Sequence, residues 1–88
     1  MQTIIEVTYP EKSVVQLEFE LPKGFKASEL LEITNDQMSG IHSFEGQTVR
    51  LYGRMTTGMT AGISHILTGI AKHLEIFDPK ENEFYRVF

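Results

Sequence analysis

The chain has 88 residues, no cysteine and a formal net charge of −4. This length fits a single domain, residues 1–88, and the lack of cysteine excludes disulfides and thiolate metal sites. A long duplex is bound by a broadly basic face, which an acidic chain does not offer, so we expect no duplex nucleic acid as a partner.

The sequence has no charged and then apolar signal segment at its start, and its apolar runs are shorter than the roughly 20 residues that span a bilayer. We therefore expect a soluble cytoplasmic protein without a membrane partner. A domain of this size buries only about 60–65% of its unfolded surface, so self-association is also expected.

The first half of the chain predicts two strands and a short helix. Gln2–Tyr9 is rich in β-branched residues, and Val14–Glu20 alternates apolar and polar residues with period two. Pro10–Ser13 between them is a predicted turn, so the pair is expected to form an antiparallel hairpin. Lys26–Ile33 is expected to form a short helix. Asn35–Gly46 lacks periodicity and is expected to be an exposed connection.

A strand and a longer helix are predicted next. Thr48–Tyr52 has the composition of a strand, and Gly53 ends it. Thr56 or Thr57 is expected to cap a helix that runs from about Gly58 to Lys72. The apolar stripe of this helix is expected to consist of Met59, Ile63, Ile66, Leu67 and Ile70.

Two further strands complete the pattern. Leu74–Phe77 and Phe84–Phe88 read as strands, and the turn Asp78–Asn82 joins them. The unit Thr48–Phe77 is expected to be a parallel crossover. The element order β-β-(α)-β-α-β-β predicts an α+β fold of the ferredoxin-like kind, in which one sheet carries helices on one face.

The segment Gly46–Leu74 contains no aspartate or glutamate, although the chain as a whole is acidic. Its charged and titratable residues are Arg50, Arg54, His65, Lys72 and His73. Guanidinium groups, hydroxyls and free backbone N–H groups bind phosphate, whereas a nearby carboxylate repels it. The pattern predicts an anion site for a small ligand with a few phosphates.

The strand-to-helix junction is the first candidate for that site. Arg54, Thr56, Thr57 and Gly58 would cradle a phosphate at the helix N-terminus, where the helix dipole favours an anion. The alternative is an ordinary turn with a capping threonine and an exposed arginine. The spacing matches neither a Walker loop nor a dinucleotide fingerprint.

Topology predicts which residues would join this junction. The loop after Tyr52 and the turn after Phe77 follow the carboxyl ends of parallel neighbours, which is where open α/β crossovers bind ligands. Arg54 is therefore expected near Asp78 and Lys80. Asp78 would bind a divalent cation or orient a histidine, and Lys80 would contact a phosphate; alternatively, Asp78 only shapes the turn.

His65 is the second candidate for chemistry. It is predicted to lie within the helix between Gly62 and Gly69, each of which costs about 1 kcal/mol relative to alanine in a helix interior. This cost suggests that a ligand or a partner backbone approaches the helix closely. His65 would then be a general acid or base, or else a packing residue at a helix–helix or subunit contact.

Three of these segments together resemble a known family. Val49–Arg54, His65 and Ile76–Lys80 are similar to the small ferredoxin-like ring nucleases of type III CRISPR systems, which degrade cyclic tetra-adenylate. The resemblance implies an antiviral phosphodiesterase built from dimers, in which two dimers sandwich a cyclic oligoadenylate. It further implies catalysis by His65 and Asp78, phosphate contacts from Arg54 and Lys80, and assistance by Mn²⁺ held at Asp78.

The chain also departs from that family. Met55–Met59 stands where the family has a proline and a tryptophan. Lys80 stands in place of an arginine; an arginine binds phosphate through a fork of donors, whereas a lysine acts as a point charge. These differences motivate a second hypothesis, a module that binds a cyclic nucleotide without cleaving it. A third hypothesis is a structural homo-oligomer in which Gly62, His65 and Gly69 form a packing seam.

Overall fold

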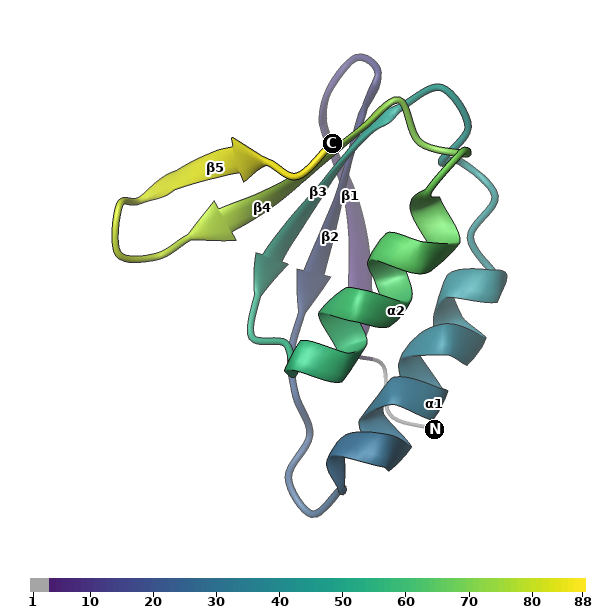
Figure 1. Cartoon of the computed structure of the whole chain (residues 1–88), viewed down its shortest axis with the longest axis vertical. Coiled ribbons are helices and arrows are strands. Elements are labelled where there is room, and N and C mark those ends of the chain that lie inside the picture. Colours follow the sequence, from purple (N-terminus) through teal and green to yellow (C-terminus); the bar gives the residue numbers. More distant parts are fainter. Residues whose placement is uncertain (1–3) are drawn as a thin grey trace.

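One mixed sheet and two helices make up the described part of the chain, residues 4–88, in the computed structural model (Figure 1). The elements in chain order are β1 (Ile5–Glu11), β2 (Val14–Phe19), α1 (Ala27–Ser39), β3 (Thr48–Gly53), α2 (Thr57–Leu67), β4 (His73–Asp78) and β5 (Glu83–Arg86). None of the helices within residues 4–88 is long and apolar enough to cross a membrane.

The five strands lie in the sheet in the same order as in the chain. β1 and β2 are antiparallel, β2–β3 and β3–β4 are parallel, and β4 and β5 are antiparallel. The predicted hairpin and the predicted parallel crossover are therefore confirmed. The α+β class with a single sheet is confirmed as well, whereas the order β-β-α-β-α-β-β is not the β-α-β-β-α-β order of the ferredoxin-like unit.

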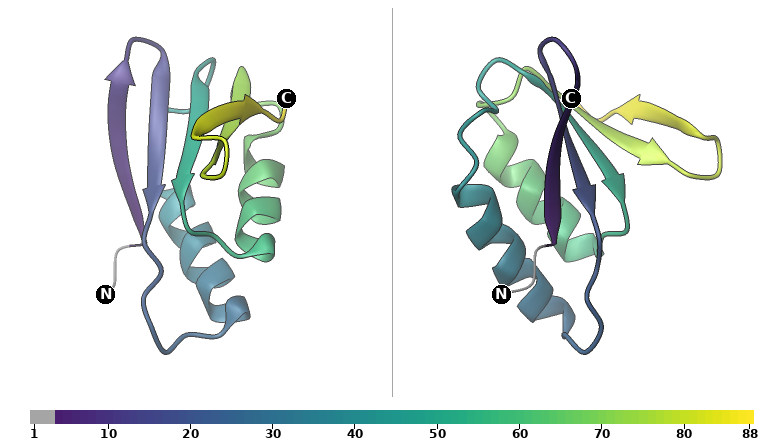
Figure 2. Two further views of the ribbon diagram at one scale, coloured as in Figure 1. Left: turned by 90° about the vertical axis from the view of Figure 1, so that its left-hand side faces the viewer. Right: turned by 180° about the vertical axis from the view of Figure 1, so that it is seen from behind.

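Both helices cover the same face of the sheet, and no helix of residues 4–88 lies on the opposite face (Figure 2). The covered face is apolar because alternate strand residues point toward the helices. Leu17, Leu51 and Leu74 on three neighbouring strands are fully buried there, together with Met59 and Ile63 of α2. The β4–β5 hairpin twists away from the helices and projects from the body of the molecule (Figures 1 and 2).

Helix α1 is longer than predicted. It runs to Ser39, so the prediction of an exposed connection over Asn35–Gly46 is wrong for Asn35–Ser39, while Gly40–Gly46 does connect α1 to β3. Met38 is 1% exposed and Phe44 is 4% exposed. The buried stripe of the helix consists of Leu30, Thr34 and Met38, and the threonine at its centre hides the apolar period. The Thr34 hydroxyl donates to the Leu30 carbonyl at 2.7 Å, which satisfies it in the core.

Helix α2 is shorter than predicted. It ends at Leu67 rather than Lys72, and Gly69 adopts a φ of 82° just beyond it, a left-handed conformation typical of helix ends. Met59, Ile63 and Leu67 are buried as expected, but Ile70 is 45% exposed and does not belong to the stripe.

The strand boundaries agree with the predictions to within a few residues. The main difference lies in the first hairpin, because Pro10 belongs to β1 rather than to the turn. The register of the β1–β2 pairing shifts between Thr8 and Glu11, the stretch that contains Pro10. Proline, which has no backbone N–H to donate, is tolerated at such an irregularity in an edge strand. Gln2 and Thr3, which the predicted first strand included, lie outside the described residues.

Candidate functional site

A hollow of about 330 Å³ opens at the carboxyl ends of β3 and β4. Its lining residues come from both strands and from the segments that follow them: Tyr52, Gly53, Arg54, Phe77 and Pro79. The order of the elements predicts that the loop after β3 meets the turn after β4, and the structure brings Arg54 and Pro79 together in this hollow.

Gly53 fixes the course of the chain into the hollow. Its φ is 108°, and a methyl group at this position would lie 2.5 Å from the carbonyl oxygen of Phe19 on the neighbouring strand. Only glycine tolerates both this conformation and this approach. The close fit of β2 against β3 therefore depends on glycine here, and Arg54 leaves the sheet edge immediately after it.

Arg54 is exposed and makes no hydrogen bond or ion pair with the described residues. No carboxylate is among the residues that line its hollow. The other arginine of the acid-free segment, Arg50, differs. Its Nε lies 2.8 Å from Glu75 Oε1, one of its terminal nitrogens lies 3.7 Å from Glu11, and its guanidinium stacks over Phe84. Of these two arginines, Arg54 is the one free to bind an anion.

The start of α2 borders the same junction. Thr56 is the N-cap, and its Oγ1 accepts the Met59 N–H at 3.1 Å. The capping interpretation of this threonine is thus the one the structure supports. Thr57 and Gly58 are exposed in the first turn, where backbone N–H groups have no partner within the helix.

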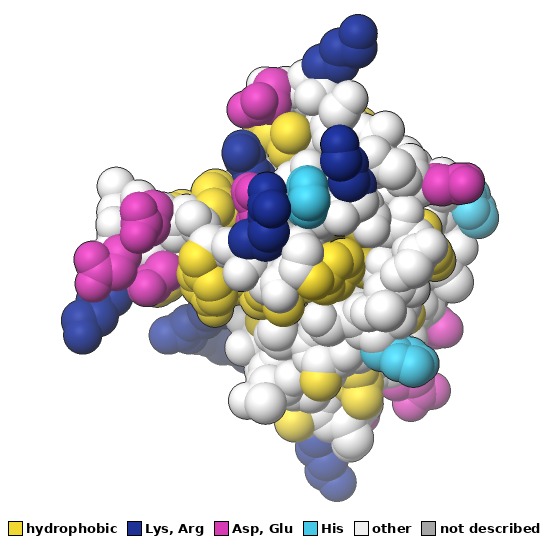
Figure 3. Space-filling view, turned by 45° about the horizontal axis from the view of Figure 1, so that its top comes forward, with side chains coloured by type: hydrophobic (Ala, Val, Ile, Leu, Met, Phe, Trp, Pro, Cys, Tyr) yellow, Lys and Arg dark blue, Asp and Glu magenta, His cyan; other side chains and the backbone are white. Residues whose placement is uncertain are grey.

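Asp78 and Lys80 lie at the tip of the β4–β5 hairpin. Asp78 Oδ1 accepts the backbone N–H groups of Lys80 at 2.9 Å and Glu81 at 3.4 Å, so this carboxylate shapes the turn. Figure 3 shows acidic side chains gathered at this tip, on the left of the view. Lys80 is exposed next to Glu81 and close to Glu83, and these carboxylates weaken the attraction of the tip for a phosphate.

The structure does not bring His65 to this end of the sheet. His65 is exposed in the last turn of α2, eight residues after Thr57 and therefore about 12 Å along the helix axis. Helix α2 leads from the carboxyl end of β3 back toward the amino end of β4, whereas Asp78 ends β4 (Figure 1). Within one chain, His65 and Asp78 lie toward opposite ends of the sheet.

The glycines near His65 have a local explanation. A methyl group at Gly62 would lie 2.9 Å from Leu31 Cδ1 and 3.3 Å from Asn35 Oδ1, so Gly62 lets the two helices approach. Gly69 lies beyond the end of α2 and was wrongly placed in its interior. The close approach inferred from the sequence is therefore the packing of α1 on α2 in the same chain.

The basic residues of the acid-free segment lie in more than one region of the surface. Lys72 and His73 stand at the amino end of β4, away from Arg54. Figure 3 shows Lys and Arg side chains gathered around a histidine on this end of the molecule. Charge in the sequence thus indicated basic surface, but it did not indicate that the surface is divided between the two ends of the sheet.

Sequence reasoning missed an aromatic cluster on the uncovered face of the sheet. The rings of Tyr52 and Phe77 have their centroids 4.7 Å apart, and Phe84 packs edge-on against Phe77 at 5.2 Å. Strand alternation contained the signal, because Tyr52 and Phe77 follow the inward-facing Leu51 and Ile76 and so point the other way.

The donors of the described residues do not fit a metal site. Residues 4–88 contain no group of three His, Asp or Glu side chains placed to hold an ion, and Asp78 already uses one carboxylate oxygen in its turn. Comparisons of the chain with protein-family models, with curated proteins and with solved structures return no match.

Proposed function

We propose that the chain is a CRISPR-associated ring nuclease, a phosphodiesterase that binds a cyclic oligoadenylate such as cyclic tetra-adenylate and cleaves it to linear products. The observation that carries this proposal is the hollow at the carboxyl ends of β3 and β4, where Arg54 is exposed and no carboxylate contributes to the lining. An unpaired guanidinium is well suited to a phosphodiester. A ferredoxin-like kinship and a cytoplasmic location belong to the same proposal.

The proposed active unit is a homodimer or a dimer of dimers. His65 and Asp78 lie toward opposite ends of one chain, so His65 of one copy would complete the site that Arg54 and Asp78 form in another. A symmetric assembly also matches a cyclic ligand built from identical units.

The remaining residues of the junction would bind the phosphate. Thr57 and Gly58 would contribute backbone N–H groups to it, Thr56 would hold that turn in place, and Lys80 would add a second cation.

The proposed reaction uses a ribose hydroxyl of the ligand as the nucleophile. The 2′-hydroxyl attacks the adjacent phosphorus while His65 accepts its proton, and Arg54 stabilises the charge on the phosphoryl oxygens. The new O2′–P bond forms as the P–O5′ bond breaks, and the leaving oxygen takes its proton from a water molecule that the Asp78 carboxylate would orient. The products are a 2′,3′-cyclic phosphate end and a 5′-hydroxyl end. Asp78 would be the single carboxylate ligand of a Mn²⁺ ion at this site, and no step of the reaction is assigned to the ion.

The test is incubation of the protein with cyclic tetra-adenylate, with and without Mn²⁺, followed by mass spectrometry of the products. Linear adenylates are expected. Arg54→Ala should lower kcat/KM about 10- to 100-fold, because a hydrogen bond to a charged group contributes about 1.5–3 kcal/mol. Lys23→Ala, which removes an exposed cation in the connection between β2 and α1, should leave cleavage unchanged. A ring that stays intact under all conditions would refute the proposal.

One observation favours a second function, capture of the ring without cleavage. Asp78 is engaged in its turn, and His65 is distant within the chain, so a copy acting alone would bind through Arg54 and lack an acid and a base. Recovery of the intact ring from a stable complex would support this binding module and exclude turnover.

A further inference from the structure

The uncovered face of the sheet carries an aromatic ring that borders the Arg54 hollow. Tyr52 is 41% exposed and lines the hollow with Phe77, against which it packs. Aromatic rings usually lie on the covered face of a sheet, because burying their apolar surface is favourable. Tyr52 thus offers an exposed ring, packed on the half-buried Phe77, beside Arg54, which has no hydrogen-bond or ion-pair partner among residues 4–88. Proteins bind single-stranded nucleic acid with this combination, by stacking bases on the ring and holding phosphates with the cation.

Tyr52 is the member of the cluster that remains open to a ligand. The guanidinium of Arg50 lies 5.1 Å from the ring centroid of Phe84, so a cation already covers that ring. Phe77 lies between the other two rings, with Phe84 at its edge. A planar group that enters the hollow would therefore meet the exposed Tyr52 ring first.

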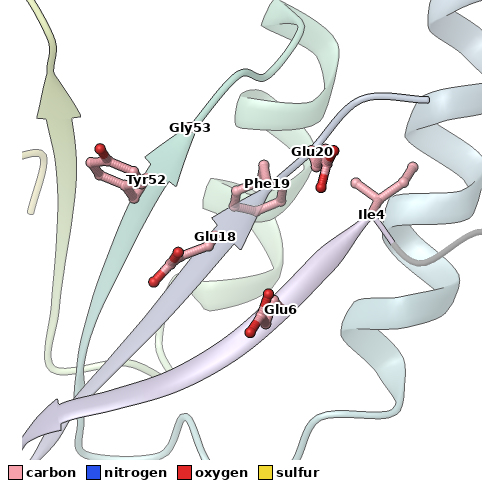
Figure 4. Close-up of a pocket in the computed structure, with 7 residues that line it drawn as sticks. All are labelled: Ile4, Glu6, Glu18, Phe19, Glu20, Tyr52 and Gly53. Atoms are coloured by element: carbon pink, nitrogen blue, oxygen red, sulfur yellow. The ribbon is translucent and has the colours of Figure 1, made fainter. Parts of the chain in front are cut away.

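Charge then determines the orientation of such a group. On the other side of Tyr52 lies a second hollow, of about 310 Å³, whose walls include Glu6, Glu18 and Glu20 (Figure 4). Glu6 and Glu18 lie side by side on neighbouring strands, and Glu20 follows the end of β2. A phosphate is repelled on this acidic side and attracted by Arg54 on the other.

We propose that the hollow beside Tyr52 binds one nucleotide of a single-stranded oligoadenylate, with the base stacked on Tyr52 and the phosphate on Arg54. The nucleotide nature of the ligand rests on the proposed function. The inference adds the position of the base and the class of ligand, because stacking and one phosphate contact do not require a closed ring. Linear adenylates therefore bind at the same place.

The experiment measures binding of linear tetra-adenylate, and of its abasic analogue, to the full chain by isothermal titration calorimetry. Tyr52→Ala is expected to weaken binding of tetra-adenylate about tenfold or more, whereas Tyr52→Phe retains it. Tyr85→Ala is the matched control. It removes a tyrosine that is 51% exposed in the same sheet, but Tyr85 follows Phe84 in β5 and therefore points to the other face.

The abasic analogue should bind the wild-type chain at least about tenfold more weakly than tetra-adenylate, since it offers phosphates without bases. Equal binding of the two ligands, or equal effects of Tyr52→Ala and Tyr85→Ala, would overturn the inference. If Tyr52→Ala does not fold, Tyr52→Leu keeps the apolar contact with Phe77 and removes the stacking ring. Retained affinity in that variant would also overturn it.

The outcome separates this inference from the proposed function. Tyr52-dependent binding of tetra-adenylate without any ring cleavage would leave the base site standing and refute the nuclease. Ring cleavage with unchanged binding in Tyr52→Ala would refute the base site and leave the nuclease standing.

Discussion

At the scale of single residues, Gln37 joins the start of the sheet to a helix. Its side-chain Oε1 accepts the backbone N–H groups of Ile4 at 3.1 Å and Ile5 at 3.0 Å. Ile4 and Ile5 are both buried, and a buried N–H without a partner costs about 1–3 kcal/mol. We expect Gln37→Ala to lower the free energy of unfolding by about 2 kcal/mol in urea denaturation.

Gln37→Glu is the control for this prediction, because a carboxylate still accepts both N–H groups. It should cost clearly less stability than Gln37→Ala. If the two variants lose the same stability, the acceptor oxygen is not what holds β1 to α1.

At the scale of elements, the junction of β2 and β3 depends on Gly53. Gly53→Ala combines a left-handed φ with a methyl group 2.5 Å from the Phe19 carbonyl oxygen. Gly46→Ala imposes a similar conformation at φ 71° with nothing within 4 Å, so it isolates the backbone strain, which costs about 1–2 kcal/mol. We expect Gly53→Ala to destabilise the protein by about 1–3 kcal/mol more than Gly46→Ala, measured by chemical denaturation. Equal losses would show that β2 and β3 adjust freely.

The sequence predicted elements well where packing follows a simple period. The strands were found because their β-branched and alternating residues reflect one buried face, as with Val49 and Leu51. The second half of α1 was missed because Thr34 occupies a core position and polar residues surround it. The end of α2 was placed too late, although Gly69 after the last buried leucine carried the stop signal.

The candidate site could be predicted only in part, because its parts come from different levels of structure. Chain topology sufficed to place Arg54 beside the Asp78–Pro79 turn. The aromatic cluster needed the register of three strands, which pairs Phe77 with Phe84. The separation of His65 from Asp78 depends on the direction of α2 across the sheet, which residue types alone do not reveal.

At the scale of the whole molecule, the proposed site needs two copies, and complementation tests this. His65→Ala and Asp78→Asn should each abolish ring cleavage. An equal mixture that exchanges subunits should recover about a quarter of wild-type activity, since half of the dimers are mixed and each mixed dimer has one intact site of two. Mass spectrometry of the products measures this recovery. No recovery, despite exchange confirmed by native mass spectrometry, would place both residues in sites built by one copy.

The order of strands in the sheet has a consequence for how the protein is made. Each strand pairs with the strand that precedes it in the chain, so no strand leaves a gap that a later segment must enter. The two parallel pairings still span a helix each, as Val14 with Thr48 and Thr48 with His73 show, but they are closer in sequence than they would be in a sheet with permuted strands, and shorter separations favour faster folding. During synthesis, which delivers the amino-terminal part first, each new strand finds its neighbour already in place. The sheet is therefore able to grow from β1 toward β5 at the pace of the ribosome.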